Sequence, residues 1–190
     1  MINPIEQFAV FLQKLPSLGP RQAFRLALYI SNMSSSEQLE FKKHLEKISS
    51  LKTCPMCFLK IVEACEICSD RNRSTGLVAI VEKETDKRSL ENTGIFTGQY
   101  LLLGELNKDG ILTTEHKRRL GSLKDREVKE VILALSPTVI GDVFFNQIKE
   151  YLNRLGIENV SGLARGITTG SDIEFADSDT LIESIKNRKK

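Results

Sequence analysis

Apolar residues recur at helical spacing near the start of the chain. In the first run they lie three or four residues apart: Ile5, Phe8, Phe11, Leu12 and Leu15. Asn3 is a favourable N-cap and Pro4 suits a first helical position, so a helix with one apolar stripe is predicted to begin here. Pro16 and the pair Gly19–Pro20 then predict a tight turn that ends this helix.

Two further helices are predicted before residue 50. The second follows the turn "LPSLGP", and its apolar positions are Ala23, Phe24, Ala27, Leu28 and Ile30. The third spans about residues 36–50, and its apolar side chains at Leu39, Leu45 and Ile48 are expected to point inward. The first third of the chain is therefore predicted to be helical.

From residue 75 onward the pattern changes to short apolar runs separated by amphipathic segments. Four runs resemble buried strands: 76–82, 100–105, 130–135 and 159–164. Helical segments separate them: about 86–92, 114–123 and 143–154. This alternation predicts a parallel sheet with helical crossovers, in which function gathers at the carboxyl ends of the strands. A last helix is predicted from about Asp179, before the basic end "KNRKK".

Composition and charge narrow the class of protein. Hydrophobic residues make up 41% and charged residues 27% of the 190-residue chain, a balance that can bury a core. The net charge of +2 gives no strong overall attraction to nucleic acid, so any basic binding surface must be local. No apolar run of membrane-spanning length occurs, and the start lacks the features of a signal peptide. We therefore expect a cytoplasmic protein without a membrane partner, whose thiols stay reduced.

All four cysteines lie in the stretch "CPMCFLKIVEACEIC", as two C-x2-C pairs: Cys54, Cys57, Cys65 and Cys68. Each pair can turn two thiolates toward one point, and two facing pairs form the tetrahedral sulfur shell that suits Zn²⁺. Such a closed shell leaves no position for water, so this zinc is expected to be structural. Two disulfides, a redox dithiol or unconnected buried cysteines are the alternatives, and the doubled spacing in a reduced compartment favours one zinc ion.

The turn "LPSLGP" between the first two helices resembles a helix-hairpin-helix motif. A glycine turn at Gly19 leaves backbone N–H groups free at a helix N-terminus, where the dipole favours a phosphate. Arg21 and Arg25 lie four residues apart on one face of the second helix, where both can reach the same DNA backbone. Such contacts are independent of sequence and sensitive to salt. The alternative is a helical hairpin of the core with two solvated arginines.

Acidic residues follow two of the predicted strands. Glu82 comes at the end of the first strand, and Asp142 follows the third in the loop "SPTVIGD". This arrangement resembles a toprim domain, whose catalytic members use a glutamate for acid–base work and a later pair of aspartates for Mg²⁺. Solvated or helix-capping carboxylates are the alternative. The two histidines, His44 and His116, lie in charge-rich segments and are expected at the surface.

The order of these modules resembles the RecR family of bacterial recombination mediators over essentially the full chain. The matching stretches are "LPSLGPRQAFRLA", the four cysteines, "VAIVE", "EVKEVILALSPTVIGD" and the tail "LARGITTGSDIEFADSDTL". The predicted fold is thus α+β with four parts. These are a helix-hairpin-helix region (1–53), a four-cysteine zinc finger (54–74), a toprim domain (75–164) and a C-terminal tail with a helix (165–190).

The resemblance implies a function without catalysis. RecR-like proteins form ring-shaped tetramers able to encircle DNA, and with RecO, and RecF at gaps, they help to load RecA in recombinational repair. It also implies that Gly19, Arg21 and Arg25 contact DNA, which is single-stranded, double-stranded or gapped. The acids implied in partner docking are Glu82, Asp86 and Asp142. The tail, residues 165–190, is expected to pack on a neighbouring subunit.

Two departures from the family pattern lie beside the acids. Ile140 stands where the family has a second acid two residues before Asp142, and "NKDGILTTEH" replaces the usual loop after the second strand. Both weaken the alternative of a Mg²⁺-dependent toprim nuclease or primase-like enzyme, which needs paired carboxylates. A zinc-stabilised interaction protein that ignores DNA is a third hypothesis. The stretch "GITTGS" lacks the lysine of a Walker A motif, so ATP hydrolysis is not expected.

Overall fold

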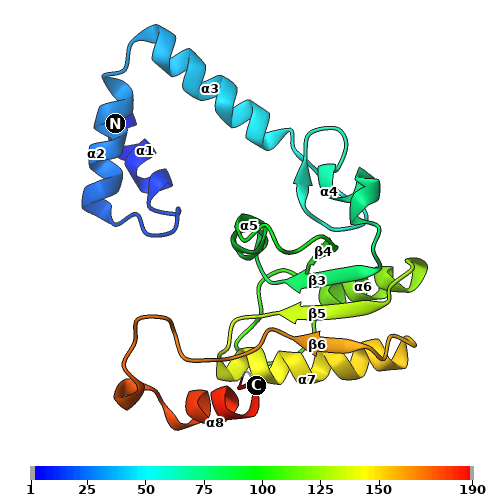
Figure 1. Cartoon of the computed structure of the whole chain (residues 1–190). Helices are drawn as coiled ribbons and strands as arrows, with labels where there is room; N and C mark the ends of the chain where they lie inside the picture. Colours follow the sequence, from blue (N-terminus) through cyan, green and yellow to red (C-terminus); the bar gives the residue numbers. More distant parts are fainter. Residues whose placement is uncertain (1–2, 189–190) are drawn as a thin grey trace. The chain divides into compact units, whose positions relative to one another are not determined.

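The computed structural model describes residues 3–188 and divides into two compact units, Met1–Leu51 and Lys52–Lys190. The predicted α+β fold class is confirmed: a helical N-terminal unit is followed by the cysteine segment and a parallel sheet with helices (Figure 1). The predicted finer division at residues 53, 74 and 164 stays a prediction. Within residues 3–188, none of the helices combines the length and the apolar character needed to cross a bilayer.

The N-terminal unit consists of α1 (Pro4–Leu12), α2 (Pro20–Ser31) and α3 (Ser35–Ser49). The Asn3 side chain caps α1 as predicted, accepting a hydrogen bond from the amide of Ile5 at 3.0 Å. A capping box between Ser34 and Glu37 begins α3. The core is small because α1 and α2 bury mainly short side chains against each other: Ala9, Leu12, Ala23 and Ala27.

The apolar side chains of α3 do not point inward, which corrects the sequence-based expectation. Leu39, Leu45 and Ile48 are 50% to 65% exposed, and no residue of α3 is buried. Phe11 and Leu15, predicted on the stripe of the first helix, are exposed as well. The physical reason is that α1 and α2 fill their own small core. Periodicity predicts which face of a helix is apolar but not which surface covers it.

The C-terminal unit begins with the cysteine segment and continues into the sheet. The cysteine segment contains the antiparallel pair β1 (Lys52–Thr53) and β2 (Lys60–Ile61), then α4 (Glu66–Ser69) and the 3₁₀ helix η1 (Arg71–Arg73). The strands of the sheet are β3 (Leu77–Val81), β4 (Gln99–Leu102), β5 (Glu130–Ala134) and β6 (Val160–Gly162). Between them lie α5 (Glu84–Asn92), α6 (Thr114–Gly121), η2 (Ser122–Asp125) and α7 (Val139–Arg154).

All four strands of this sheet are parallel, in the order β4-β3-β5-β6, as the alternating pattern predicts. Ile80 at the centre of β3 pairs with Leu101 on one side and Leu133 on the other. The observed strands fall inside the predicted runs apart from a one-residue shift at β4. Helix α7 starts earlier than predicted, because the Thr138 side chain caps it by accepting from the amide of Gly141.

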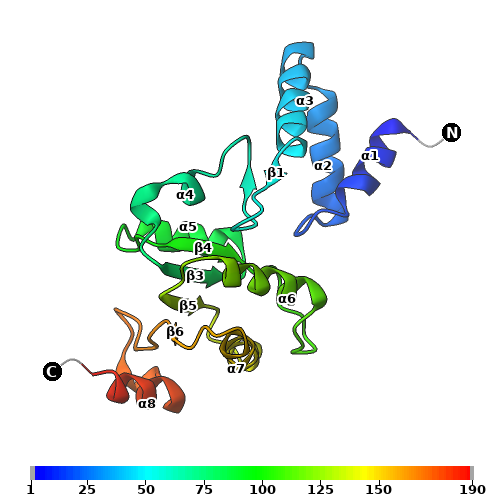
Figure 2. The same ribbon diagram turned by 90° about the vertical axis from the view of Figure 1, so that its right-hand side faces the viewer.

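The two faces of the sheet are covered by different modules. Val78 and Ile80 of β3 pack into the larger core, to which α6, η2 and α7 contribute Leu120, Leu123 and Phe144. Figure 2 shows α6 and α7 on the same side of the strands. The alternate residues Ala79 and Val81 face a second core. Cysteines 54, 57 and 65 belong to that core, together with Tyr100 and Ile67. The cysteine segment therefore takes the place of a helical layer over part of the sheet.

His116 is buried, which corrects the expectation that both histidines lie at the surface; His44 is exposed. The Nδ1 atom of His116 accepts a hydrogen bond from the backbone amide of Thr113 at 3.3 Å. The backbone amide of His116 in turn donates to the Thr113 hydroxyl at 3.1 Å, and the two bonds form the N-terminal cap of α6. Burial lowers the pKa of His116, so the neutral ring is favoured. The surface position was predicted from the charged residues around His116 in the sequence. It was wrong because one face of α6 packs on the core while the other faces are exposed to solvent.

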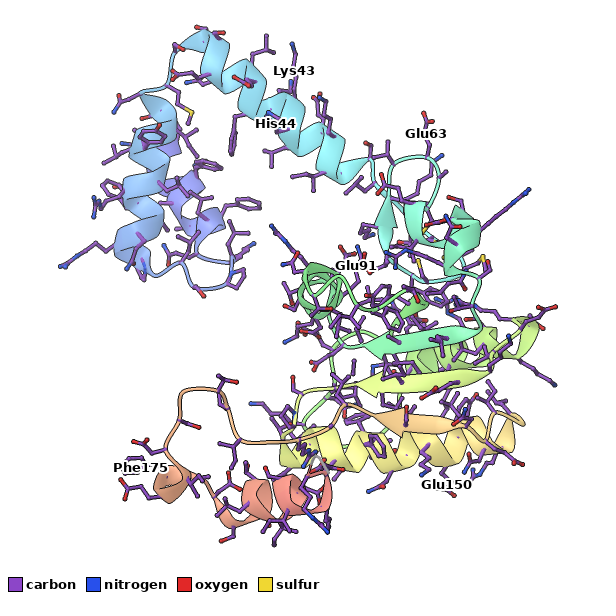
Figure 3. All side chains as sticks on the ribbon, in the orientation of Figure 1. Lys43, His44, Glu63, Glu91, Glu150 and Phe175 are labelled. Atoms are coloured by element: carbon purple, nitrogen blue, oxygen red, sulfur yellow. The ribbon has the colours of Figure 1, made fainter. Side chains whose placement is uncertain are left out.

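The chain ends in an extended tail with η3 (Ile173–Phe175) and α8 (Ser178–Lys186). The last helix begins one residue before its predicted start, with the Asp177 side chain as its cap. Large apolar side chains of the tail remain exposed, among them Phe175, Ile182 and Ile185. Figure 3 shows Phe175 projecting from the tail. Nothing in the described part of the C-terminal unit covers these side chains.

Candidate functional site

The four cysteine sulfurs converge on one point, as the spacing predicts. The sulfurs of Cys54, Cys57, Cys65 and Cys68 all lie within 4.8 Å of one another. The Cys57 and Cys65 sulfurs are 3.4 Å apart and those of Cys54 and Cys68 are 3.9 Å apart, too far for disulfide bonds. A tetrahedral zinc ion with Zn–S bonds near 2.3 Å places its sulfurs about 3.8 Å apart. The geometry therefore fits one tetrathiolate metal site.

Backbone amides of the first knuckle point at the sulfurs. The amides of Met56 and Cys57 donate to the sulfur of Cys54, and the amide of Leu59 donates to that of Cys57. The turn closes because Phe58 adopts a positive φ of 62° and its amide donates to the carbonyl of Cys54 at 3.0 Å. Amide donors stabilise the thiolate form, which is the form that binds metal.

The charged form of the Cys57 thiol is unfavourable when no cation is present. The pKa of Cys57 is raised by its hydrogen bond with Cys68 and then by burial. A divalent cation at the centre reverses this, since metal binding requires and favours deprotonated sulfur. The arrangement can thus hold a metal ion and offers no open position for a substrate, so it is suited to a structural role.

Hydrogen bonds fasten the cysteine segment to the sheet. The carbonyl of Cys57 accepts from the amide of Leu102 at 2.8 Å, at the end of β4. The amide of Lys60 donates to the Glu84 carboxylate of α5 at 3.0 Å. The Phe58 ring lies under the guanidinium of Arg118 at 5.0 Å, a cation–π contact with α6. The metal site and the sheet are therefore parts of one packed structure.

A partly buried ion pair adds a further connection, which the sequence did not reveal. Arg73 of η1 donates to both carboxylate oxygens of Glu91 on α5, at 2.9 and 2.7 Å, and the Tyr100 hydroxyl donates to the same carboxylate at 2.7 Å. Figure 3 labels Glu91 beside the sheet. Burial alone would raise the pKa of Glu91, but the bonds from Arg73 and Tyr100 outweigh it and hold that pKa below its usual value.

The change Glu91→Gln is expected to lower the free energy of unfolding by about 2 kcal/mol, because it leaves the guanidinium of Arg73 partly buried without its counter-charge. The contribution of Glu91 is present above pH 4.5, its ordinary pKa, and is lost as the pH falls through the lower pKa of the folded state. The difference in the free energy of unfolding between wild type and variant should therefore become smaller below pH 4.5.

Urea unfolding at several pH values measures this difference. Glu150→Gln is the matched control, since Glu150 pairs with Arg154 on the exposed side of α7 and should cost less than about 0.5 kcal/mol (Figure 3). Equal losses in the two variants at neutral pH would show that the Arg73–Glu91 pair adds nothing beyond a surface contact.

The helical hairpin presents the predicted basic residues to solvent. Gly19 is the N-cap of α2 and Pro20 occupies its first turn, so the amides of Arg21 and Gln22 have no carbonyl within the helix to donate to. Arg21 and Arg25 are both exposed and lie one turn apart. Within residues 3–188 no ion pair involves either guanidinium. Both side chains are accessible to a ligand with negative charge.

The three acids predicted to dock a partner each have a local partner in the structure. The Glu82 side chain is only 14% exposed and accepts from the amide of Leu106 at 3.4 Å. Asp86 accepts from the amide of Lys83 at 2.8 Å as part of the cap of α5. Asp142 is half exposed and forms a two-pronged ion pair with Arg165 of the tail.

The Asp142–Arg165 pair was not predictable from sequence. The matching stretch "LARGITTGSDIEFADSDTL" singled out the tail, but nothing in its spacing indicates which acid Arg165 meets. Arg165 now places a cation beside Asp142, at the strand end where catalytic toprims hold Mg²⁺. Ile140 packs against the main core instead of offering a second carboxylate. Gly141 has no room for a side chain, since a Cβ would lie 2.0 Å from the carbonyl oxygen of Ser136.

Comparison with known proteins places this arrangement among recombination proteins. Residues 76–161 match the Toprim domain family. The chain is 36% identical to "Recombination protein RecR" of Syntrophomonas wolfei over 199 aligned positions, covering 100% of the chain and 98% of that protein. It is 37% identical to the protein of the same name from Streptococcus sanguinis, with 98% and 96% covered. The Dehalococcoides mccartyi protein is 32% identical, with 94% and 90% covered.

Proposed function

Since the chain belongs to the RecR family of recombination proteins, we propose that it is a DNA-binding recombination mediator without catalytic activity of its own. The observation that carries this proposal is the similarity to RecR proteins along essentially the whole chain, from the helical hairpin to the tail. The role is in recombination and DNA repair. The finer steps below rest on the residues that the structure exposes or pairs.

The helical hairpin is the proposed DNA contact. Gly19 leaves amides free at the start of α2, and the exposed Arg21 and Arg25 add two positive charges beside them. Contacts of this kind bind phosphates and carry no sequence information. The protein therefore binds single-stranded, double-stranded or gapped DNA according to shape and charge.

The proposed active form is a ring of several copies, a dimer or tetramer, through which DNA passes. Supporting this, the apolar side of α3 is exposed within the N-terminal unit, and the apolar side chains of the tail are exposed within the C-terminal unit. Large exposed apolar patches are typical of interfaces. The tail, residues 165–190, is the proposed contact with a neighbouring subunit.

A RecO-like protein, and a RecF-like protein at gaps, are the proposed partners in loading a RecA-type recombinase. Glu82, Asp86 and Asp142 are the proposed docking acids. Of these, Asp142 is half exposed and pairs with Arg165. A basic group of the partner can take the place of Arg165 in this pair. Glu82→Ala and Asp142→Ala should weaken partner binding while leaving DNA binding unchanged.

The proposed function is tested by loading a RecA-type recombinase onto gapped DNA coated with single-strand-binding protein. Together with a RecO-like partner, the protein should shorten the delay before recombinase filaments form. Filament formation at the same rate with and without the protein would contradict the mediator role.

No cleavage, priming or strand passage is expected with Mg²⁺ or Mn²⁺. Mg²⁺ prefers strict octahedral geometry and usually needs carboxylates from the protein, and the strand end offers Asp142 alone, already paired with Arg165. The measurement is incubation of labelled gapped and supercoiled DNA with either metal. Turnover that disappears in Glu82→Ala would instead identify a toprim enzyme.

We also propose that the metal of the four cysteines is zinc and that the protein acts in the cytoplasm. The four converging sulfurs and the amides aimed at them support zinc. When bound, the ion holds the two knuckles together. The residues of the sheet that pack against them, Ala79 and Val81, are then kept from water.

A further inference from the structure

Arg126 carries a buried guanidinium with no hydrogen-bond partner. It follows η2, where its backbone amide donates to the carbonyl of Leu123 at 3.1 Å and its carbonyl accepts from the amide of Val128 at 2.9 Å. Its two terminal nitrogens are out of contact with solvent, and neither makes a hydrogen bond within the described part of the chain. A charged group in this state is unfavourable unless an opposite charge lies nearby.

The opposite charges that act on Arg126 belong to the cysteine cluster. Burial lowers the pKa of Arg126, and negative charge on Cys68, Cys57 and Cys54 opposes that effect, in this order of strength. Four thiolates around one divalent cation carry a net charge of −2. A mostly buried cluster of this charge requires positive groups around it, just as the buried guanidinium requires negative ones.

Three other arginines near the cysteine segment are already engaged, and Arg71 is exposed to solvent. Arg73 forms its two-pronged pair with Glu91. Arg118 and Arg119 bind the carboxylate of Glu115 and lie over the Phe58 ring. Arg126 therefore stands out in the described chain as a buried cation near the sulfurs without an acidic partner.

We propose that Arg126 is an outer-shell partner of the metal–thiolate cluster, whose buried positive charge neutralises part of the cluster's negative charge. Because Arg126 lies in the connection between η2 and β5, the affinity for the metal then depends on a segment of the toprim region. Arg126 also lowers the reactivity of the thiolates toward oxidants and alkylating reagents. The proposal rests on the metal centre of the proposed function but not on DNA binding or partner docking.

The test compares Arg126→Met, which keeps much of the volume but loses the charge, with Arg126→Lys and with Lys124→Met, an exposed neighbour, as control. Each protein is loaded with Zn²⁺ and titrated with a chelator of known affinity. We expect the Kd for zinc to rise about 10- to 100-fold in Arg126→Met, less in Arg126→Lys, and not at all in the control. An unchanged Kd in a folded Arg126→Met protein would overturn the proposal.

Replacing zinc with Co²⁺ gives a second measurement, the position of the thiolate-to-cobalt absorption band, which a packing defect alone would not change. A nearby positive charge lowers the energy of sulfur lone pairs, so the thiolate-to-cobalt charge-transfer band should shift to longer wavelength in Arg126→Met and stay in place in the control. If Arg126→Met does not fold, Arg126→Lys serves, because its compact ammonium does not spread the charge as the guanidinium does and should give a smaller shift. Identical bands in wild type and the folded variant contradict the proposal.

These measurements distinguish an error in the proposed metal centre from an error in the proposed role of Arg126. If wild type shows no thiolate-to-cobalt band, the tetrathiolate centre itself is wrong and Arg126 has no cluster to stabilise. If wild type shows the band but neither Kd nor band position changes at Arg126, the metal centre stands and only the outer-shell role falls.

Discussion

Cys57→Ser and Cys65→Ser are each expected to give insoluble or partly unfolded protein that no longer holds one metal ion. Both cysteines are buried in the second core, where they pack with Ala79 and Val81 of the central strand. A structural zinc ion contributes apparent binding free energies of about 10–16 kcal/mol in zinc-finger peptides, comparable to the whole stability of a domain at about 5–15 kcal/mol. Losing the metal therefore exposes one face of the sheet as well as the knuckles.

Native mass spectrometry and circular dichroism measure the metal content and the folding of each variant. Met56→Ser is the matched control, because Met56 lies in the same knuckle but is exposed and is not one of the four clustered ligands. It should stay soluble with one zinc ion per chain. A folded, metal-free wild-type chain with two disulfides would overturn the structural-zinc assignment.

The double change Arg21→Ala, Arg25→Ala is expected to weaken DNA binding on all sequences alike. Both guanidinium groups are exposed beside the free amides of α2, so each can contact one phosphate. The slope of log K against log salt should become less steep by about one unit per lost contact, or about two units in all. The affinity at low salt should fall about 100-fold, at about 1.4 kcal/mol for each of the two lost charge-assisted contacts.

Fluorescence anisotropy with two unrelated DNA sequences across a salt series measures both quantities. Lys149→Ala with Arg154→Ala removes the same net charge from exposed positions on α7 and is the control. Equal losses in the two double variants would mean that net charge alone matters. If the Arg21→Ala, Arg25→Ala variant has normal DNA affinity and a normal salt slope, the hairpin only connects helices of the core and does not contact DNA.

The elements with strong local signals were predictable from sequence. The runs around β3 and β5 are apolar and β-branched, and their order with the intervening helices favours a parallel sheet. The cysteine cluster was equally clear, since the ligand spacing of a closed sulfur site is a local property of the chain. Asn3 and Pro4 marked the first helix start for the same reason.

Features that depend on long-range packing were not predictable. The exposure of Leu39 and Ile48 depends on what covers α3, and the described part of the N-terminal unit holds no such cover. His116 is buried because α6 turns that one position toward Phe144, whose ring centroid lies 5.9 Å away. No spacing rule connects residues so far apart in the chain as Asp142 and Arg165.

The division of the sheet into two covered faces links the metal to the proposed function. The larger core under α6 and α7 is that of an ordinary parallel α/β domain. The second core includes the buried cysteines of the two knuckles, and the Arg73–Glu91 pair connects η1 with α5 beside it. We infer that the cysteine segment, which packs on the sheet through this core, stabilises the toprim region.

The central claim is that this protein assembles and binds DNA without altering it. Sedimentation velocity of the labelled protein, alone and with gapped DNA, tests assembly and binding in one measurement. We predict a species larger than the 21.4 kDa monomer in the absence of DNA, and joint sedimentation of that assembly with intact gapped DNA. A monomer at every concentration that sediments apart from DNA at low salt would contradict it.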